Sequence, residues 1–202
     1  MLVVGEGAGC GTRRPVGVLL EPMAVPSAHD RSMSPEHRLT SDPIAEARRQ
    51  WERRGWREAA PGMAALTAIM RTQQIMLGEV ESALRPFGIS FSRYELLMLL
   101  LFSRTGMLPM SKLSARLQVH PASVTNSVDR LESDGLVRRE EDPADRRGRL
   151  VTLTEDGRDL AGEATEQLNI VFSDLGIPPE DLAELSRILA DYRRRVGDFG
   201  EG

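Results

Sequence analysis

The stretch VHPASVTNSVDRLESDG, residues 119–135, decides how the rest of the chain is interpreted. Pro121 is typical of the first turn of a helix, and Gly135 is typical of the position just after a helix ends. Between them, bulky apolar residues recur at helical spacing: Val124, Val128 and Leu131. The pattern predicts a helix with one narrow buried stripe.

The opposite face of this helix carries short or hydrogen-bonding side chains: Ala122, Ser123, Asn126, Asp129 and Arg130. An ordinary surface helix favours Glu, Lys and Gln, which are better helix formers. Short side chains let a helix approach base edges in the major groove of DNA, which is about 12 Å wide. Asn126 suits an adenine edge, Ser123 several bases, and Ala122 a thymine methyl group. We therefore expect a DNA-reading helix, with a plain surface helix as the alternative.

Composition limits the class of protein. The chain has 202 residues, 41% of them hydrophobic and 28% charged, which fits one compact domain with or without tails. The longest apolar run, 96–102, falls far short of the roughly 20 residues that span a bilayer, so no membrane partner is expected. The net charge of −4 excludes indiscriminate coating of nucleic acid and leaves room for a local basic patch. The single cysteine, Cys10, fits a reducing cytoplasm.

Composition also changes along the chain. Residues 1–40 are rich in Gly, Pro, Ser and Arg and are predicted to be a disordered tail. The segment 41–58 is expected to be an additional N-terminal helix, over 43–57 after Pro43, and the main domain is expected over 60–198.

Capping signals place the next helices. Ser92 and Glu95 have the spacing of a capping box and predict a helix that continues to about Arg104. Ser111 is predicted to cap a short helix that ends at Leu117.

A hairpin follows Gly135. LVRREE and RLVTLT predict two strands, and DPADRRG predicts the turn between them. Thr154 is expected to cap a helix that runs to about Asp174, and Pro178 and Pro179 to begin the last helix.

The order of a short helix, a turn, a second helix and a hairpin is that of a winged helix-turn-helix, here over 107–153. The expected fold is mainly α (α+β), with helices over 62–85 and 155–195 flanking the winged module as a dimerisation domain. Residues 111–153 hold eight Lys or Arg against seven Asp or Glu, so affinity for DNA must depend on where the arginines lie. The expected turn brings three of them to the tip of the wing, where they suit the minor groove: Arg146, Arg147 and Arg149.

The run LSARLQVHPASVTNSVDRLESDGLVRR, followed by DPADRRGRLVTLTEDG, resembles the MarR family of bacterial transcription regulators. The resemblance covers residues 60–195, and its most specific part is DPADRR, then VTLT, then Gly157. It implies that Arg147 enters the minor groove while Asp145 orients it. It also implies an obligate homodimer with interleaved terminal helices.

The residues expected to contact DNA lie on the two helices and the wing: Ser111, His120, Pro121, Ala122, Ser123, Thr125, Asn126, Arg130, Asp145, Arg146, Arg147 and Arg149. Among them, Pro121 fixes the start of the reading helix, whose free N–H groups can meet a phosphate. His120 is expected near that phosphate, since no Cys or His lies at metal-ligand spacing from it. No metal and no cofactor are expected.

Dimerisation also follows from the residues alone, because the flanking helices carry more apolar surface than the winged module could cover. Two-fold symmetry would set two reading helices roughly 34 Å apart and predicts a palindromic operator.

Trp51 raises the question of an effector site. An added N-terminal helix with a tryptophan resembles the urate-responsive subgroup of the family, whose pocket implies ligand-binding roles for Trp51, Glu95 and Ser103. This chain departs from that subgroup, with Glu95 in place of Asp, Ser103 in place of Asn and Ser127 in place of Arg. A role of Trp51 as an apolar clamp on the dimer is the alternative.

Together these features predict a ligand-responsive repressor that acts as a homodimer, with a small anionic aromatic effector. A protein-interaction scaffold that uses the fold without DNA is the alternative. An enzyme is not expected, because the sequence has no GxSxG, HExxH or phosphate-binding glycine loop.

Overall fold

The computed structural model describes residues 39–142 and 145–200, with the backbone alone described for 145–147. The predicted tail, including Cys10, therefore lies outside the described residues apart from its last two positions. The elements follow the chain in this order: α1 (Pro43–Arg53), α2 (Ala60–Leu84), the 3₁₀ helix η2 (Arg85–Phe87), α3 (Phe91–Leu101), β1 (Met107–Pro109), α4 (Met110–Leu117), α5 (Pro121–Ser133), β2 (Val137–Asp142), β3 (Asp145–Leu153), α6 (Glu155–Ser173) and α7 (Pro179–Arg195).

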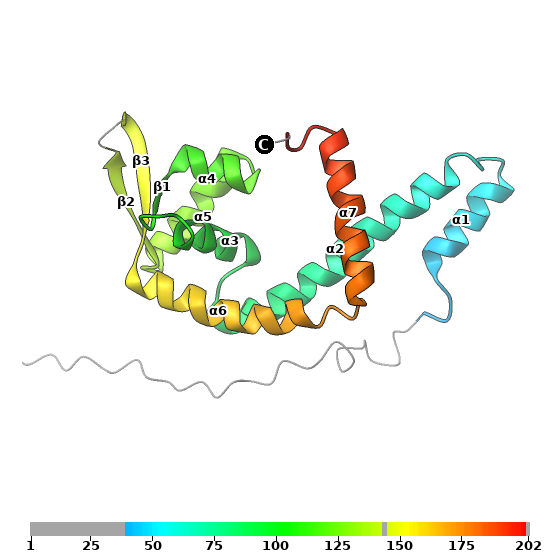
Figure 1. The fold of residues 1–202 in the computed structure, drawn as a ribbon, viewed down its shortest axis with the longest axis horizontal. Helices are drawn as coiled ribbons and strands as arrows, with labels where there is room; N and C mark the ends of the chain where they lie inside the picture. The colour runs from blue at the N-terminus through cyan, green and yellow to red at the C-terminus, as the bar shows by residue number, and fades with distance from the viewer. Residues whose placement is uncertain (1–38, 143–144, 201–202) are drawn as a thin grey trace, which may run out of the picture.

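The long helix α6 connects two parts of the molecule (Figure 1). At one end lie the winged module of α3, α4 and α5 and the small sheet. The helix α2 packs against α6 and extends away from it, with α1 folded back on its far end, while α7 rises from the other end of α6. The mainly helical winged helix-turn-helix is thus confirmed.

The predicted hairpin is confirmed as β2 and β3, and the sheet has a third antiparallel strand, β1, that the sequence did not predict, in the order β1-β3-β2. The third strand, β1, pairs Met107 with Thr152 and Pro109 with Leu150. A three-residue strand has too little alternation to be recognised locally, and its position is set by pairing with β3.

The turn of the hairpin is shorter than predicted. We expected a turn over DPADRRG, but β3 begins at Asp145, which pairs with Asp142. The next pair is Glu141 with Arg149, and the register shifts between the two. Residues 146–148 therefore lie on β3 between these two pairs and have no counterpart on β2, an irregularity of the β-bulge kind, which bends a strand and increases its twist.

The hydrophobic core joins the winged module to α6 and the end of α2. It is built mainly from leucine and valine side chains that are fully buried: Leu84, Leu96, Leu97, Leu100, Leu113, Leu131, Leu168, Val124, Val128, Val137, Val151 and Val171. In contrast, α1 and α7 bury no residue in this single chain.

The start of α3 corrects the predicted capping box. Its N-cap is Ser90, whose Oγ accepts a hydrogen bond from the backbone N–H of Arg93 at 3.4 Å, and Ser92 lies inside the first turn. The acidic partner comes from α2, where Glu81 Oε1 accepts from the backbone N–H of Phe91 at 2.9 Å. Glu95 therefore has no capping role, and the helix ends at Leu101, earlier than the predicted Arg104.

The predicted cap of α4 was also wrong. This helix begins at Met110 with Pro109 as its N-cap, so Ser111 lies in the first turn and makes no cap. At α6 the prediction is confirmed, because Thr154 Oγ1 accepts from the backbone N–H of Gly157 at 3.0 Å.

The N-terminal helix is shorter than the sequence suggested. After Pro43 it continues only to Arg53, and Gly55 follows with a φ of 89°. The chain then folds back, so that the rings of Trp51 and Trp56 meet edge to face with centroids 5.2 Å apart.

Candidate nucleic-acid interface

The helix α5 has the boundaries that its sequence predicted. His120 is its N-cap, with Nδ1 accepting from the backbone N–H of Ala122 at 3.2 Å, and Pro121 occupies the first helical position. After the C-cap, Gly135 has a φ of 75°, a conformation that glycine adopts without steric cost. The stripe of Val124, Val128 and Leu131 is fully buried, so the opposite face must point outward.

On that outward face, some side chains are free to contact DNA, and others already bond to neighbouring residues. Ser123, Asn126 and Arg130 are exposed, and within the described ranges their side chains make no hydrogen bond or ion pair. The hydroxyl of Thr125 donates to the carbonyl of Pro121 at 3.1 Å, and Asp129 is held by an arginine from the wing. The available groups are those that can donate to base edges and phosphates.

Arg139 of β2 is a residue that the sequence did not single out. Its guanidinium pairs with Asp129 and, at 3.6 Å, with Glu132, both on α5. Its backbone N–H also donates to Glu132 Oε1 at 2.9 Å. Arg139 thus fixes the wing against the reading helix and neutralises a carboxylate beside the face that would meet DNA.

The turn before α5 is held by two further contacts. Ser114 Oγ donates to the carbonyl of Val119 at 3.1 Å, and Gln118 adopts the left-handed conformation with a φ of 53°. Ser111 is exposed on the first turn of α4, at the opposite end of that helix from Gln118.

On the wing, the described arginines have acidic neighbours. Arg138 Nε lies 2.6 Å from Glu140 Oε1, and Arg149 Nη1 lies 3.9 Å from Glu141 Oε1. The side chains of Asp145, Arg146 and Arg147 lie outside the described residues, so their predicted roles at the wing tip stay predictions.

The three residues expected at an effector site do not come together in one chain. Trp51 is on α1, which lies at the opposite side of the molecule from α3 (Figure 1). Ser103 follows α3, and its hydroxyl donates to the carbonyl of Leu100 at 2.7 Å. Glu95 remains largely exposed on α3, although partial burial raises the pKa of its carboxyl. The effector site stays a prediction.

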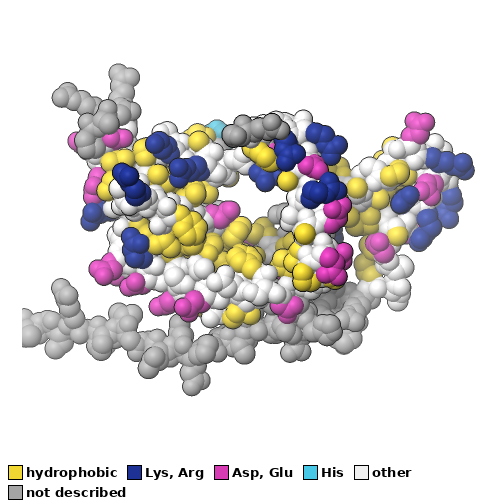
Figure 2. Space-filling view, in the orientation of Figure 1, with side chains coloured by type: hydrophobic (Ala, Val, Ile, Leu, Met, Phe, Trp, Pro, Cys, Tyr) yellow, Lys and Arg dark blue, Asp and Glu magenta, His cyan; other side chains and the backbone are white. Residues whose placement is uncertain are grey.

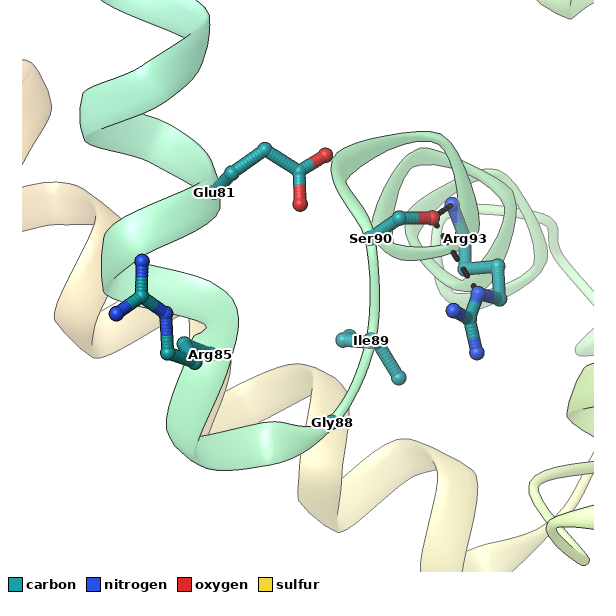
Figure 3. A pocket seen from close by; sticks show the side chains of 6 residues that line it. All are labelled: Glu81, Arg85, Gly88, Ile89, Ser90 and Arg93. Carbon is teal, nitrogen blue, oxygen red and sulfur yellow. Dashed lines mark hydrogen bonds between the residues drawn. The ribbon is translucent and has the colours of Figure 1, made fainter.

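A depression of about 370 Å³ lies elsewhere, at the junction of α2 and α3. Figure 3 shows Glu81 and Arg85 on one side of it and Ser90 and Arg93 on the other. Because Glu81 caps α3 and Ser90 accepts from Arg93, these polar groups serve the junction itself. None of the predicted effector residues lines this depression.

Comparison with known proteins agrees with this geometry. The model of the MarR family matches residues 91–148. The structure of Sco5413, a MarR family transcriptional regulator from Streptomyces coelicolor, is 47% identical in sequence and covers 70% of this chain and 99% of its own, with a TM-score of 0.64. The chain belongs to the MarR family.

Two further relatives extend the comparison. The HTH-type transcriptional regulator YhbI of Bacillus subtilis is 37% identical over 100 residues, which are 50% of this MarR-family chain and 62% of YhbI. This chain therefore spans less than two thirds of YhbI. The structure of CouR from Rhodococcus jostii RHA1, bound to p-coumaroyl-CoA, is 31% identical and covers 60% of this chain and 86% of CouR, with a TM-score of 0.53.

The MarR family is one of transcriptional regulators, not enzymes. Among the helices in the described part of this MarR-family chain, none is both long and apolar enough to cross a bilayer.

Proposed function

We propose that the chain is a cytoplasmic, sequence-specific DNA-binding regulator that acts as a homodimer on a palindromic operator. The observation that carries the proposal is the exposed face of α5, where Ser123, Asn126 and Arg130 are free of internal partners among the described residues. A helix held by a buried stripe on one side and offering short donors on the other fits the major groove.

The homodimer is supported by apolar side chains that the single chain leaves exposed. On α7 and at its C-cap they recur along one face: Leu185, Ile188, Leu189, Tyr192 and Val196. On α2 a second set has the same spacing: Leu66, Ile69, Met70 and Leu77. Figure 2 shows hydrophobic side chains bordering the hollow between the winged module and α7. Contiguous apolar surface of this kind marks an interface, and a second copy of the chain would cover both faces by symmetry.

We also propose that the regulator is a repressor, and that a small molecule relieves repression by binding between the dimer helices and the winged module. CouR, a relative with the same fold, was crystallised with p-coumaroyl-CoA, which makes an aromatic, anionic effector the first class to test here. Such a ligand must bind the DNA-incompetent arrangement more tightly than the competent one.

The experiment that tests DNA reading is selection of bound sequences from a random duplex library by the purified full chain, followed by footprinting. We expect an inverted repeat with half-site centres about 10 base pairs apart. Asn126→Ala should weaken binding by roughly 1–3 kcal/mol and relax the preference at one base pair per half-site.

Two variants complete this test. Arg147→Ala should weaken binding to all sequences about equally and reduce the dependence on salt, as expected for a backbone or minor-groove contact. Ser133→Ala, at the exposed end of α5, serves as the control and should bind as the wild type does. Enrichment of no inverted repeat by the wild-type protein would refute the proposal.

A further inference from the structure

Gln118 occupies a position that favours glycine. It is the C-cap of α4 in the turn of the helix-turn-helix, and its φ of 53° is the one positive value at a non-glycine position within the described residues. Glycine adopts this conformation without steric cost, whereas a residue with a Cβ is disfavoured there. A glutamine at such a site indicates that its side chain makes a contact that glycine could not make.

That contact is with Asp198, close to the C-terminal end of the described residues. Gln118 Nε2 donates to the backbone carbonyl of Asp198 at 3.2 Å and to its Oδ1 at 3.1 Å. These hydrogen bonds span 80 residues of sequence and join the turn before the reading helix to the segment just after α7.

That segment, residues 196–199, is a defined structure, which we term the C-terminal hook. The N–H groups of Gly197 and Asp198 return to the carbonyls of Arg194 and Arg193, the pattern of a Schellman motif, and Gly197 has a φ of 78°. Asp198 Oδ2 accepts from Arg193 Nε at 2.6 Å. Both arginines also lie over the ring of Phe199, at 5.1 and 5.7 Å from its centroid.

The hook presents both oxygens of the Asp198 carboxylate in fixed directions, one to α7 and one to Gln118. We infer that the contact between Gln118 and Asp198 positions the reading helix α5 relative to α7, and so fixes the distance between the two reading heads of the dimer. This inference rests on the proposed function, since α7 carries the apolar face through which the second copy would be reached.

A role in positioning fits the energetics better than a role in folding. Gln118 and Asp198 are exposed, and exposed hydrogen bonds contribute little to stability. The helix α7 buries no residue in the single chain, so its orientation depends on such contacts. Apart from this contact, α3 connects the winged module to the scaffold by packing against α2 and α6.

The test uses the operator selected above, with zero, one or two base pairs inserted between its half-sites. Two inserted pairs rotate one half-site by about 70° relative to the other, so a rigid dimer should discriminate strongly between these duplexes. The discrimination is the ratio of the affinity for the unmodified operator to the affinity for the duplex with two inserted pairs. Gln118→Gly and Asp198→Ala should each reduce this ratio about fivefold, the effect of one or two lost hydrogen bonds.

Two readouts separate positioning from a loss of fold. Affinity for a single half-site duplex and the thermal midpoint should not fall in Gln118→Gly, because glycine relieves the backbone while removing the amide. Asp181→Ala, the same substitution at the other end of α7, should keep the wild-type discrimination. An unchanged spacing profile in both hook variants would overturn the inference.

A second measurement needs no DNA, and so stands even if the proposed function fails. Spin labels at Ala115 on α4 and Ala183 on α7, in a Cys10→Ser background, report the distance between the two helices. With labelled chain diluted into an excess of unlabelled Cys10→Ser chain, so that a dimer carries one labelled protomer, we expect one narrow distance distribution for the wild-type hook and a broadened one after Asp198→Ala. Equal widths in the two proteins would contradict a positioning role.

Discussion

Gly157 on α6 lies directly against the backbone of Leu136. A Cβ added to this glycine would be 2.0 Å from the carbonyl oxygen of Leu136 and 3.0 Å from the side chain of Leu153. The same carbonyl accepts from the backbone N–H of Thr154 at 3.2 Å, so it cannot move without breaking the junction between the sheet and α6. The close approach of α6 to the start of β2 requires glycine at this position.

Gly157→Ala should therefore destabilise the protein by more than about 3 kcal/mol, since the clash is with backbone. Gly162→Ala is the matched control on the same helix, where an added Cβ meets nothing within 4 Å. It should raise stability by about 0.5–1 kcal/mol through helix propensity. Chemical denaturation measures both, and equal stability of the two variants would show that the junction can relax.

Arg139 should prove important for both stability and DNA binding. Its side chain is 25% exposed and pairs with Asp129 and Glu132, so Arg139→Ala removes the positive charge from both carboxylates, although Glu132 keeps the backbone N–H of residue 139. We expect a loss of about 1 kcal/mol in the free energy of unfolding and weaker DNA binding, because the freed acids are partly exposed and lie beside the reading face.

Arg138→Ala is the control for this prediction. Arg138 is the preceding residue of β2, its side chain is 65% exposed, and it pairs with Glu140 of the same strand. Its loss should change stability by less than about 0.5 kcal/mol. If both variants behaved alike, the pairing of Arg139 with α5 would have no special role.

The cap that Glu81 provides to α3 can be tested by two substitutions. Glu81→Ala removes the acceptor for the N–H of Phe91 and should lower the free energy of unfolding by about 1 kcal/mol. Glu81→Gln keeps an amide oxygen at the same place and should recover most of that loss. Thermal denaturation distinguishes the two, and no recovery by glutamine would point to the charge instead of the hydrogen bond.

The carboxyl of Glu95 should make stability depend on pH. Partial burial raises its pKa above the ordinary value of 4.5, so the folded state holds more protons than the unfolded state just above that value. Stability contributed by this group is thus present at lower pH and lost as pH rises through the folded pKa. Glu95→Gln should raise the thermal midpoint at pH 7 and have no such effect well below pH 4.5. Glu163→Gln, at an exposed site of α6, controls for the loss of one charge.

The sequence predicted those parts of the fold whose signals are local. Pro121, Gly135 and the stripe between them define α5, and Thr154 marks the start of α6, because each signal acts within one or two turns of helix. The free donors on α5 were recognised in the same way.

The parts that sequence reasoning missed depend on partners distant in the chain. Glu81 caps α3 from another helix, so the local capping box of Ser92 and Glu95 was a false signal. The bond between Arg139 and Asp129 exists only because β2 crosses α5, and β1 exists only because β3 lies beside it. A pattern confined to one element does not carry such information.

The apolar face of α7 offers a direct test of the proposed dimer. Ile188 is 48% exposed in the single chain, between Leu185 and Tyr192 on the same face. Burying a carboxylate at such a site without a partner is costly, so Ile188→Glu should weaken self-association at least about tenfold. Ser186→Glu adds the same charge two residues away and should leave the dimer intact. Sedimentation at micromolar concentration measures the self-association of both variants.

Because the core of the winged module does not include Ile188, the Ile188→Glu chain should remain folded, bind one half-site duplex and lose its preference for the full palindrome. A dimer that persisted in Ile188→Glu would place the interface on another face.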